Sequence, residues 1–319
     1  MAKNKYAVGV DLGGTNIKIG LVEANGKISK KISVDSCASE GPERVLSQIK
    51  SGINLITENC KGKIIGIGIG APGAVKLKKG TVENPPNFPG WNKVHVGNIL
   101  KKEFKCDVYV ENDANAAAIG ELTYGSGRKY KSFVMVTLGT GVGSGIIFNK
   151  EIFRGDAGIA GEIGHVSIDY KGPQCRCGNY GCLEAYLGNS YLVERVKRDL
   201  NMNKESMITG LVRGDYNLLT PKIIHAAAVN NDPFAVSVVK DCGNLLGSLL
   251  ASVVHVLDIT TFIIGGGLAG FGDLLFEATG NSARERVMKP FKERIKILPA
   301  KLKNDAGIKG ASALVFYKS

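Results

Sequence analysis

Four side chains that bind metals well lie close together near the middle of the sequence. His165 is followed by Cys175, Cys177 and Cys182, and the three cysteines fall within eight residues. One imidazole and three thiolates complete the tetrahedral shell of a structural Zn²⁺, and the glycines between the cysteines permit a tight loop. Because such a shell leaves no open position for water, the sequence predicts a structural metal, with three unrelated reduced thiols as the alternative.

Three glycine-rich turns follow apolar runs and are candidates for phosphate binding. They are Gly13-Gly14-Thr15-Asn16, Gly139-Thr140-Gly141 and Gly265-Gly266-Gly267. Successive backbone N–H groups in such turns form a concave surface that binds anions. Beside the first turn, Asp11 could hold Mg²⁺ directly or through water, and Lys18 could meet a phosphate. A tight turn with a solvated lysine is the alternative, and the missing Walker-type lysine motif disfavours a P-loop fold.

A carboxylate at the end of a predicted strand is a candidate general base. Asp113 follows the apolar run 108–110 and precedes the alanine-rich run 114–122, which is typical of a helix. The helix dipole would favour its ionised form, ready to take a proton from a hydroxyl group. A helix N-cap is the structural alternative, and one residue can serve both roles.

Two further carboxylates flank the predicted metal loop. Glu162 lies three residues before His165, and Glu184 lies two residues after Cys182. Carboxylates that a metal-bound loop holds in place suit a ligand with several hydroxyl groups.

The composition is that of an ordinary globular protein. Of the 319 residues, 44% are hydrophobic and 22% are charged, which excludes a disordered chain. The formal net charge of +12 favours anionic partners, either nucleic acid or a phosphorylated small molecule. Residues 1–5 contain no export signal, so we expect a cytoplasmic protein with reduced thiols. The apolar stretch 245–268 is predicted to be a buried helix and strand and not a membrane span.

The elements that must position these residues follow from the periodicity of apolar residues. We predict strands at 6–10, 64–70 and 108–110, a hairpin of 17–22 and 27–34, and helices from Pro42 and over 114–122. The order of turn and hairpin then recurs at 136–148, which indicates a duplicated unit, although a chance likeness is the alternative. Such a duplication would place two phosphate-binding turns face to face across a cleft. Asp305 is predicted to cap a C-terminal helix that packs back on the first domain.

We therefore expect an α/β protein with two domains. Residues 1–116 with 306–319 would form a smaller, discontinuous α/β domain, and residues 117–305 would form a larger α/β domain that carries the zinc-binding loop.

These motifs resemble the ROK family of repressors, open reading frames and kinases, and most closely its bacterial glucokinases. The resemblance covers nearly the whole chain. It is carried by five motifs in order, at Asp11–Asn16, Glu111–Asn115, Leu138–Gly143, Gly161–His165 and Cys175–Glu184. One small departure is Ser144, which stands where glucokinases often have glycine.

The resemblance implies an actin-like, hexokinase-type ATPase fold whose two domains close on ATP and a sugar. It implies that Asp113 is the catalytic base and that Mg²⁺ accompanies ATP near Asp11. His165 would hold zinc through one ring nitrogen and face the sugar with its other edge. The residues that would line the sugar pocket are Gly73, Asn87, Asn112, Glu162, His165 and Glu184. A homodimer or homotetramer is also implied.

The leading hypothesis is transfer of the γ-phosphoryl group of ATP to the 6-hydroxyl of glucose. N-acetylmannosamine, N-acetylglucosamine, fructose and allose are alternative acceptors within the same family. A sugar-responsive repressor is an alternative from another class. Repressors of this family carry a winged helix-turn-helix before the first strand, and only five residues precede Tyr6 here. We therefore expect no specific nucleic-acid partner and no membrane partner.

Overall fold

The structure is a computed structural model that describes residues 5–202 and 204–317. Residues 1–4, on which the predicted lack of an export signal mainly rests, lie outside this range. The chain forms two compact units. Unit 1 contains residues 1–135, 145–161 and 300–319, and unit 2 contains residues 136–144 and 162–299. The boundary predicted at residue 116 falls inside unit 1, whereas the return of the C-terminal segment to unit 1 agrees with the expectation.

Unit 1 is built on a five-stranded sheet with the order β3-β2-β1-β4-β8. The strands are β1 (Lys5–Leu12), β2 (Asn16–Glu23), β3 (Ile28–Asp35), β4 (Lys63–Ala71) and β8 (Val108–Asn112). β1 pairs antiparallel with β2 and parallel with β4, and β4 pairs parallel with β8. The carboxyl ends of β1, β4 and β8 therefore meet at one edge of the sheet. This edge carries Asp11 and Asn112.

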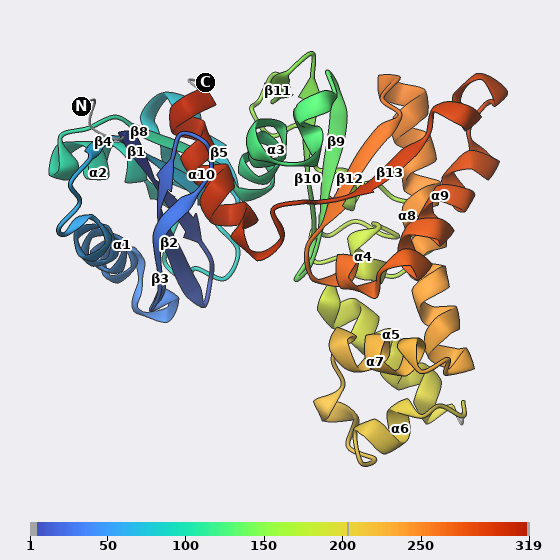
Figure 1. Ribbon diagram of the computed structural model, residues 1–319. Coiled ribbons are helices and arrows are strands. Elements are labelled where there is room, and N and C mark those ends of the chain that lie inside the picture. Colours follow the sequence, from blue (N-terminus) through green and yellow to red (C-terminus); the bar gives the residue numbers. More distant parts are fainter. Residues whose placement is uncertain (1–4, 203, 318–319) are drawn as a thin grey trace. The chain divides into compact units, whose positions relative to one another are not determined.

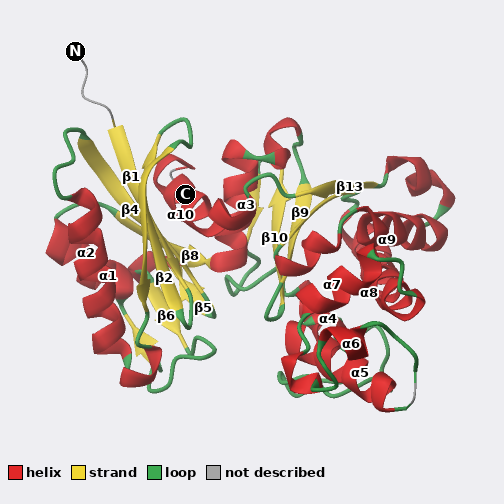
Figure 2. Cartoon of the chain, turned by 60° about the horizontal axis from the view of Figure 1, so that its bottom comes forward, coloured by secondary structure: helices red, strands yellow, loops and turns green. Residues whose placement is uncertain are grey.

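Helices cover both faces of this sheet (Figures 1 and 2). One face carries α1 (Pro42–Thr57) and α2 (Val96–Phe104), and the other carries α3 (Asp113–Tyr124) and α10 (Ala306–Tyr317). The predicted helix from Pro42 is confirmed as α1, with proline in its first turn. Its apolar positions Val45, Ile49, Ile53 and Ile56 are all buried, as the helical spacing requires.

The C-terminal helix α10 packs on the sheet through its backbone. A side chain at Gly9 or Gly68 would collide with the backbone of α10, at Ile308 and Ala311 respectively. Gly310 in turn lies against the backbone of α3 at Ala116. The predicted return of this helix to the first domain is thus confirmed. Small residues on both sides permit the close approach, and α10 in this way supports the helix that begins at Asp113.

The second sheet repeats the strand order of the first. Its order is β11-β10-β9-β12-β13, formed by β9 (Phe133–Leu138), β10 (Val142–Phe148), β11 (Glu151–Phe153), β12 (Thr261–Gly265) and β13 (Lys296–Pro299). In both sheets the strand that comes first in the sequence leads into a hairpin and then neighbours a later strand on its other side. The predicted duplication is therefore confirmed at the level of topology.

Unit 2 adds a group of helices to its strands. They are α4 (Glu184–Leu187), α5 (Asn189–Asn201), α6 (Ile208–Leu211), α7 (Pro221–Val229), α8 (Pro233–Leu257) and α9 (Asp273–Arg286). α8 packs along α9, as Figure 1 shows. By length and composition α8 could cross a membrane, but 56% of its most apolar window is buried inside the protein. The stretch 245–268 divides into α8 and β12, as predicted.

A small third sheet was not predicted. It consists of β5 (Ala74–Lys76), β6 (Thr81–Glu83) and β7 (Lys93–Val94) in antiparallel pairing. These strands have two or three residues, which is too short for an alternating pattern to be recognised. The sheet matters because it flanks the loop 84–92, which carries one of the predicted sugar-binding residues.

Candidate functional site

The carboxylate of Asp11 lies at the end of β1, beside the start of α10. A side chain at Gly307, the second residue of α10, would collide with this carboxylate. Lys18 Nζ lies 3.9 Å from Asp11 Oδ2, so the two residues predicted to meet Mg²⁺ and phosphate are neighbours. Burial raises the pKa of Asp11, and Lys18 partly offsets the rise. A bound cation would again favour the ionised form of the Asp11 carboxylate. Carboxylate oxygens are ligands that Mg²⁺ prefers, so Asp11 fits this ion.

We expect Asp11→Asn to raise the melting temperature at pH 7 by a few degrees. Since the pKa is higher in the folded state, the ionised carboxylate destabilises the fold above its ordinary pKa of 3.8, and this effect disappears as the pH falls. The gain should therefore be present at pH 7 and vanish below pH 3.8. Thermal unfolding followed by circular dichroism, without nucleotide or Mg²⁺, measures it. Lys18→Met should shift the melting temperature in the opposite direction, and an Asp11→Asn protein less stable than wild type at pH 7 would contradict the expectation.

The first glycine turn is held by a short network. The N–H of Gly13 donates to the carbonyl of Asn16 at 3.1 Å. Ser36 donates through its hydroxyl to Gly14 O at 2.6 Å and through its N–H to Thr15 O at 2.9 Å. Thr15 and Asn16 are exposed, so part of the predicted phosphate-binding turn is open to solvent.

At the end of β8, the cap of α3 comes from Asn112 and not from Asp113. The side-chain oxygen of Asn112 accepts from Ala114 N at 2.9 Å and from Asn115 N at 3.2 Å. The alternative in which Asp113 is the N-cap is therefore wrong, because Asn112 already accepts hydrogen bonds from the N–H groups of Ala114 and Asn115. Asp113 is the first residue of the helix and is exposed, and its Oδ1 accepts from Ala114 N at 2.8 Å.

Two predicted sugar-binding residues lie on loops near Asn112 and the first turn. Asn112 Nδ2 donates to Gly73 O at 3.3 Å, which joins the loop after β4 to the end of β8. Asn87 has a positive φ of 66°, and a Cβ at Gly14 would lie 3.1 Å from its own Cβ. Unit 1 therefore gathers Gly73, Asn87 and Asn112 with the first glycine turn along one edge of its sheet.

The loop that carries Asn87 is anchored by two buried aromatic side chains. The rings of Phe88 and Trp91 meet edge to face with their centroids 5.3 Å apart. Trp91 Nε1 donates to Val82 O at 3.3 Å, which ties the loop to β6. Both rings are at most 5% exposed, so buried aromatic packing anchors the loop on which the exposed Asn87 lies.

In unit 2 the second and third glycine turns lie side by side. Gly139 follows β9 and has free space where a side chain would be, and its N–H donates to Gly141 O at 2.9 Å. Gly266 has a positive φ of 86°, and a Cβ there would collide with the backbone of Leu138 at the end of β9. Thr140, Gly266 and Gly267 are exposed. Two adjacent, open turns with free backbone approach can accommodate a chain of phosphate groups.

The four predicted zinc ligands come together. The ligand atoms of His165, Cys175, Cys177 and Cys182 all lie within 4.8 Å of one another. Sγ of Cys175 is 3.7 Å from His165 Nδ1, and Sγ of Cys177 is 3.7 Å from Sγ of Cys182. Tetrahedral Zn²⁺ with bonds of about 2.0–2.3 Å needs ligand atoms about 3.5–3.8 Å apart, and these two pairs have that spacing. One imidazole and three thiols are also a donor set that this ion prefers.

The loop that presents these ligands is tight, as its glycines predicted. Gly178 and Gly181 have positive φ values of 94° and 67°. The N–H of Cys175 donates to Asn179 O at 2.8 Å, and Gly178 N donates back to Cys175 O at 2.9 Å. All seven cysteines of the chain lie in the described residues, and none of them forms a disulfide there.

The thiols of this cluster differ in acidity. Burial raises the pKa of Cys175 and raises that of Cys182 to about 12. A hydrogen bond from the backbone of Asn179 lowers the pKa of the exposed Cys177. Because zinc binds thiolates, loading this site must release protons from the two buried thiols.

Glu184 connects the metal cluster to the second glycine turn, a role that was not predicted. Its Oε2 accepts from Val142 N at 2.9 Å, and a side chain at Gly141 would collide with its carboxylate. Its Oε1 lies 3.8 Å from the thiol of Cys175. Glu162 is exposed immediately before the 3₁₀ turn Ile163–His165. Unit 2 thus brings Glu184, His165 and the turn 139–141 into one contiguous region.

Sequence reasoning gave no role to Arg154, whose guanidinium contacts Glu111 in unit 1. From the sequence, Glu111 is recognisable only as part of the motif Glu111–Asn115. Arg154 Nε donates to Glu111 Oε2 at 2.9 Å across 43 positions in the sequence. Only the polarity of a strand residue beside apolar neighbours could have drawn attention to Glu111 before the structure.

Comparison with known proteins gives four informative matches. The ROK family model matches residues 7–318. The glucokinase of Thermotoga maritima is 33% identical over 308 residues, 97% of this chain and 96% of that protein. The xylose repressor of Caldicellulosiruptor bescii is 31% identical over 312 residues, 97% of this chain and 77% of the repressor. A ROK family glucokinase from Streptomyces griseus, solved with glucose and AMPPNP, has a TM-score of 0.85 and 33% identity, covering 97% of this chain and 98% of that one.

Proposed function

The chain belongs to the ROK family and has its actin-like, hexokinase-type α/β fold, and from this premise we propose that it is an ATP-dependent hexose kinase that acts on the 6-hydroxyl group, with glucose as the preferred sugar. The observation that carries the proposal is the exposed carboxylate of Asp113 on the first turn of α3. Because Asn112 caps the helix, this carboxylate is not needed for that purpose. Similarity to glucokinases over the full chain supports glucose.

In the proposed reaction, the oxygen of the sugar 6-hydroxyl forms a bond to the γ-phosphorus of ATP. The bond between that phosphorus and the β,γ-bridging oxygen breaks, and ADP leaves with the electron pair. Asp113 orients the hydroxyl group and accepts its proton. We assign sugar hydroxyl groups to Gly73, Asn87 and Asn112 in unit 1 and to Glu162, His165 and Glu184 in unit 2.

The glycine turns are the proposed nucleotide-binding elements. They comprise Gly13, Gly14, Thr15, Asn16, Gly139, Thr140, Gly141, Gly266 and Gly267. Their backbone N–H groups would bind phosphate oxygens, and Lys18 would add a positive charge. When bound beside Asp11, Mg²⁺ supplies neutralisation of the phosphate charge.

Zinc has a positioning role in this proposal. His165, Cys175, Cys177 and Cys182 would hold it, with Nδ1 of His165 toward the thiols. The opposite edge of the imidazole would then be free for a sugar hydroxyl. A bound metal would fix both His165 and its neighbour Glu184, and so order two of the proposed sugar contacts.

Initial rates of ADP formation with a panel of sugars test the function. The panel contains glucose, fructose, allose, mannose, N-acetylglucosamine and N-acetylmannosamine, each with MgATP. We expect the highest kcat/KM with glucose. With another sugar, the loss of a well-placed polar contact should lower kcat/KM by 10-fold or more, which corresponds to on the order of 1.4 kcal/mol. A higher kcat/KM for an acetamido sugar would change the assigned substrate. No turnover with any sugar would refute the kinase.

The similarity to xylose repressors supports a second candidate, a sugar-responsive regulator of transcription. The net charge of +12 is compatible with it but gives only non-specific attraction to DNA. An electrophoretic mobility shift with random genomic fragments at physiological salt distinguishes the two. Under the kinase proposal no fragment is preferred, whereas one fragment bound selectively and released by a sugar would support the regulator.

The remaining parts of the proposal follow from the family. We propose a cytoplasmic homodimer or homotetramer that has ATP and a sugar as its partners and binds neither specific nucleic acid nor membranes. The unpaired cysteines support the reducing compartment.

A further inference from the structure

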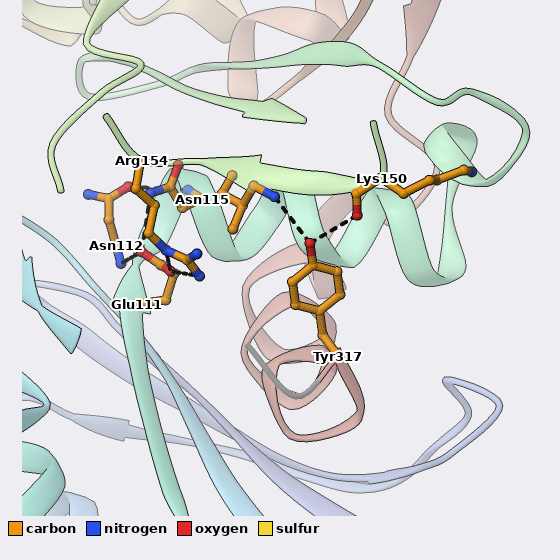
Figure 3. A network of polar contacts seen from close by, with 7 residues as sticks. Glu111, Asn112, Asn115, Lys150, Arg154 and Tyr317 are labelled. Carbon is orange, nitrogen blue, oxygen red and sulfur yellow. Dashed lines mark hydrogen bonds and ion pairs between the residues drawn. The ribbon is translucent and has the colours of Figure 1, made fainter. Parts of the chain in front are cut away.

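Glu111 is a buried charge immediately before the two residues on which the proposed chemistry depends. Its side chain is 3% exposed at the end of β8. Oε1 accepts from the backbone N–H of Asn112 at 3.0 Å and from Asn115 Nδ2 at 3.1 Å. Oε2 accepts from Arg154 Nε at 2.9 Å (Figure 3). The carboxylate is therefore hydrogen-bonded both to the backbone at Asn112 and to a side chain in the first turn of α3.

Arg154 is fixed at two points. Its guanidinium pairs with Glu111, with Nη2 also 2.9 Å from Oε2. Its carbonyl accepts from Ala160 N at 2.9 Å, so residues 154–160 form a closed loop. A positive φ of 69° at Gly155 lets this loop fold back on Ala160. The closed end of the loop thus lies two residues before Glu162.

The strand that leads to Arg154 is itself anchored. The hydroxyl of Tyr317, on α10, donates to Lys150 O at 2.9 Å and accepts from Ile152 N at 3.1 Å. Figure 3 shows this ring beside β11, next to the cluster around Glu111. Because the backbone before Arg154 is held at two atoms, the guanidinium is presented to Glu111 from a fixed position.

The side chain of Glu111 is 3% exposed and that of Arg154 is 21% exposed, so the ion pair is largely removed from water. Such a pair is a poor way to gain stability, since desolvation offsets most of the attraction. Its better use is to specify one arrangement of the segments that carry it. Here those segments end at Asn112 and Asp113 on one side and run into Glu162 on the other. These are residues from which we have proposed sugar contacts and the general base.

We propose that Glu111 and Arg154 form a positioning pair for the sugar site, which sets the placement of Asn112 and Asp113 relative to the closed loop 154–160 of the same unit. The inference rests on the proposed function and deepens it, because it identifies which buried groups determine sugar affinity. Neither residue touches the substrate. The pair acts through the backbone of Asn112 and through the closed loop 154–160.

The test is Glu111→Gln, which keeps the shape and removes the charge, with Glu121→Gln as the matched control. Glu121 is also a fully buried carboxylate in the same unit, and it accepts from the backbone of Leu302 and Ser126. We expect both variants to lower the melting temperature. Only Glu111→Gln should raise the KM for the sugar, by about tenfold or more, with the KM for ATP within about twofold of wild type.

Two more variants keep the test independent of folding. Arg154→Lys keeps the charge without the planar fork and should recover part of the sugar affinity that Arg154→Met loses. The double variant Glu111→Gln with Arg154→Met leaves no unpaired charge, so its melting temperature should be no lower than that of the worse single variant, while the raised sugar KM remains.

Sugar affinity is also read directly from the fluorescence of Trp91, the single tryptophan of the chain, near Asn87. The inference is overturned if Glu111→Gln and Glu121→Gln change the sugar KM equally, or if the double variant recovers the sugar KM together with its stability. In those cases an active wild-type enzyme still supports the proposed kinase. A wild type that neither binds nor phosphorylates any sugar refutes the proposed function instead.

Discussion

Replacement of Asp113 by Asn is expected to lower kcat by about 10²–10⁴-fold, the usual contribution of a general base. The amide has the same shape and can still hydrogen-bond a sugar hydroxyl, but it cannot accept the proton. The dissociation constant for the sugar should therefore stay within about twofold of wild type. The melting temperature should also change little, because the cap of α3 comes from Asn112. Steady-state kinetics and sugar titration followed by Trp91 fluorescence measure the two effects separately.

Asp273 provides a matched control for this experiment. It is the first residue of α9, as Asp113 is the first residue of α3, and it is not among the proposed site residues. Asp273→Asn should therefore leave kcat unchanged while making the same change of charge at a helix N-terminus. Turnover retained in Asp113→Asn, or lost equally in both variants, would remove Asp113 from the role of base.

Replacement of Cys182 by Ser is expected to abolish zinc binding and to weaken sugar binding by about 10–100-fold. Cys182 is completely buried, and its Sγ lies 3.7 Å from that of Cys177. Wild-type protein should contain about one Zn²⁺ per chain. Without the metal the loop loses the constraint that holds His165, and Glu184 loses a fixed neighbour. Elemental analysis of purified protein gives the zinc content, and sugar titration gives the affinity.

Cys242→Ser is the control for the loss of a buried thiol. Cys242 is equally buried, in α8, and burial also raises its pKa to about 12. Its replacement should lower stability to a similar degree through the buried hydroxyl, but it should leave zinc content and sugar affinity intact. If zinc-free wild type, prepared with a chelator, kept its full sugar affinity, the metal would have no part in the sugar site.

Much of the local structure could be predicted because it depends on neighbours in the sequence. The hairpin around Asn25-Gly26, the helix from Pro42 and the recurrence of a glycine turn before a second hairpin are all patterns of a few residues. The zinc cluster belongs to the same class. Its three cysteines lie on one tight loop, and glycines with positive φ close that loop. Short spacing and local backbone geometry are enough to bring such groups together.

The motif around Asp113 could be recognised in the sequence, but the sequence did not show whether Asn112 or Asp113 caps the helix. Asp and Asn are both good N-caps, and Asn112 and Asp113 stand side by side at the start of the helix. Which of them caps depends on where the last strand residue leaves the sheet. That point is fixed by the pairing of β8 with β4, where Asn112 lies opposite Ala71.

The amino-acid sequence by itself determined which chemical groups the protein has, the helices and strands that carry them and the local loops that cluster the zinc ligands. Only the tertiary structure decided which segments that are distant in the sequence contact and stabilise one another. Glu111 meets Arg154 across 43 positions, Glu184 meets Val142 across 42, and α10 lies on glycines of the first sheet. The physical reason is that these contacts depend on the packing of whole elements. A period of two or 3.6 residues reports only which face of an element is apolar, and not which element will cover it.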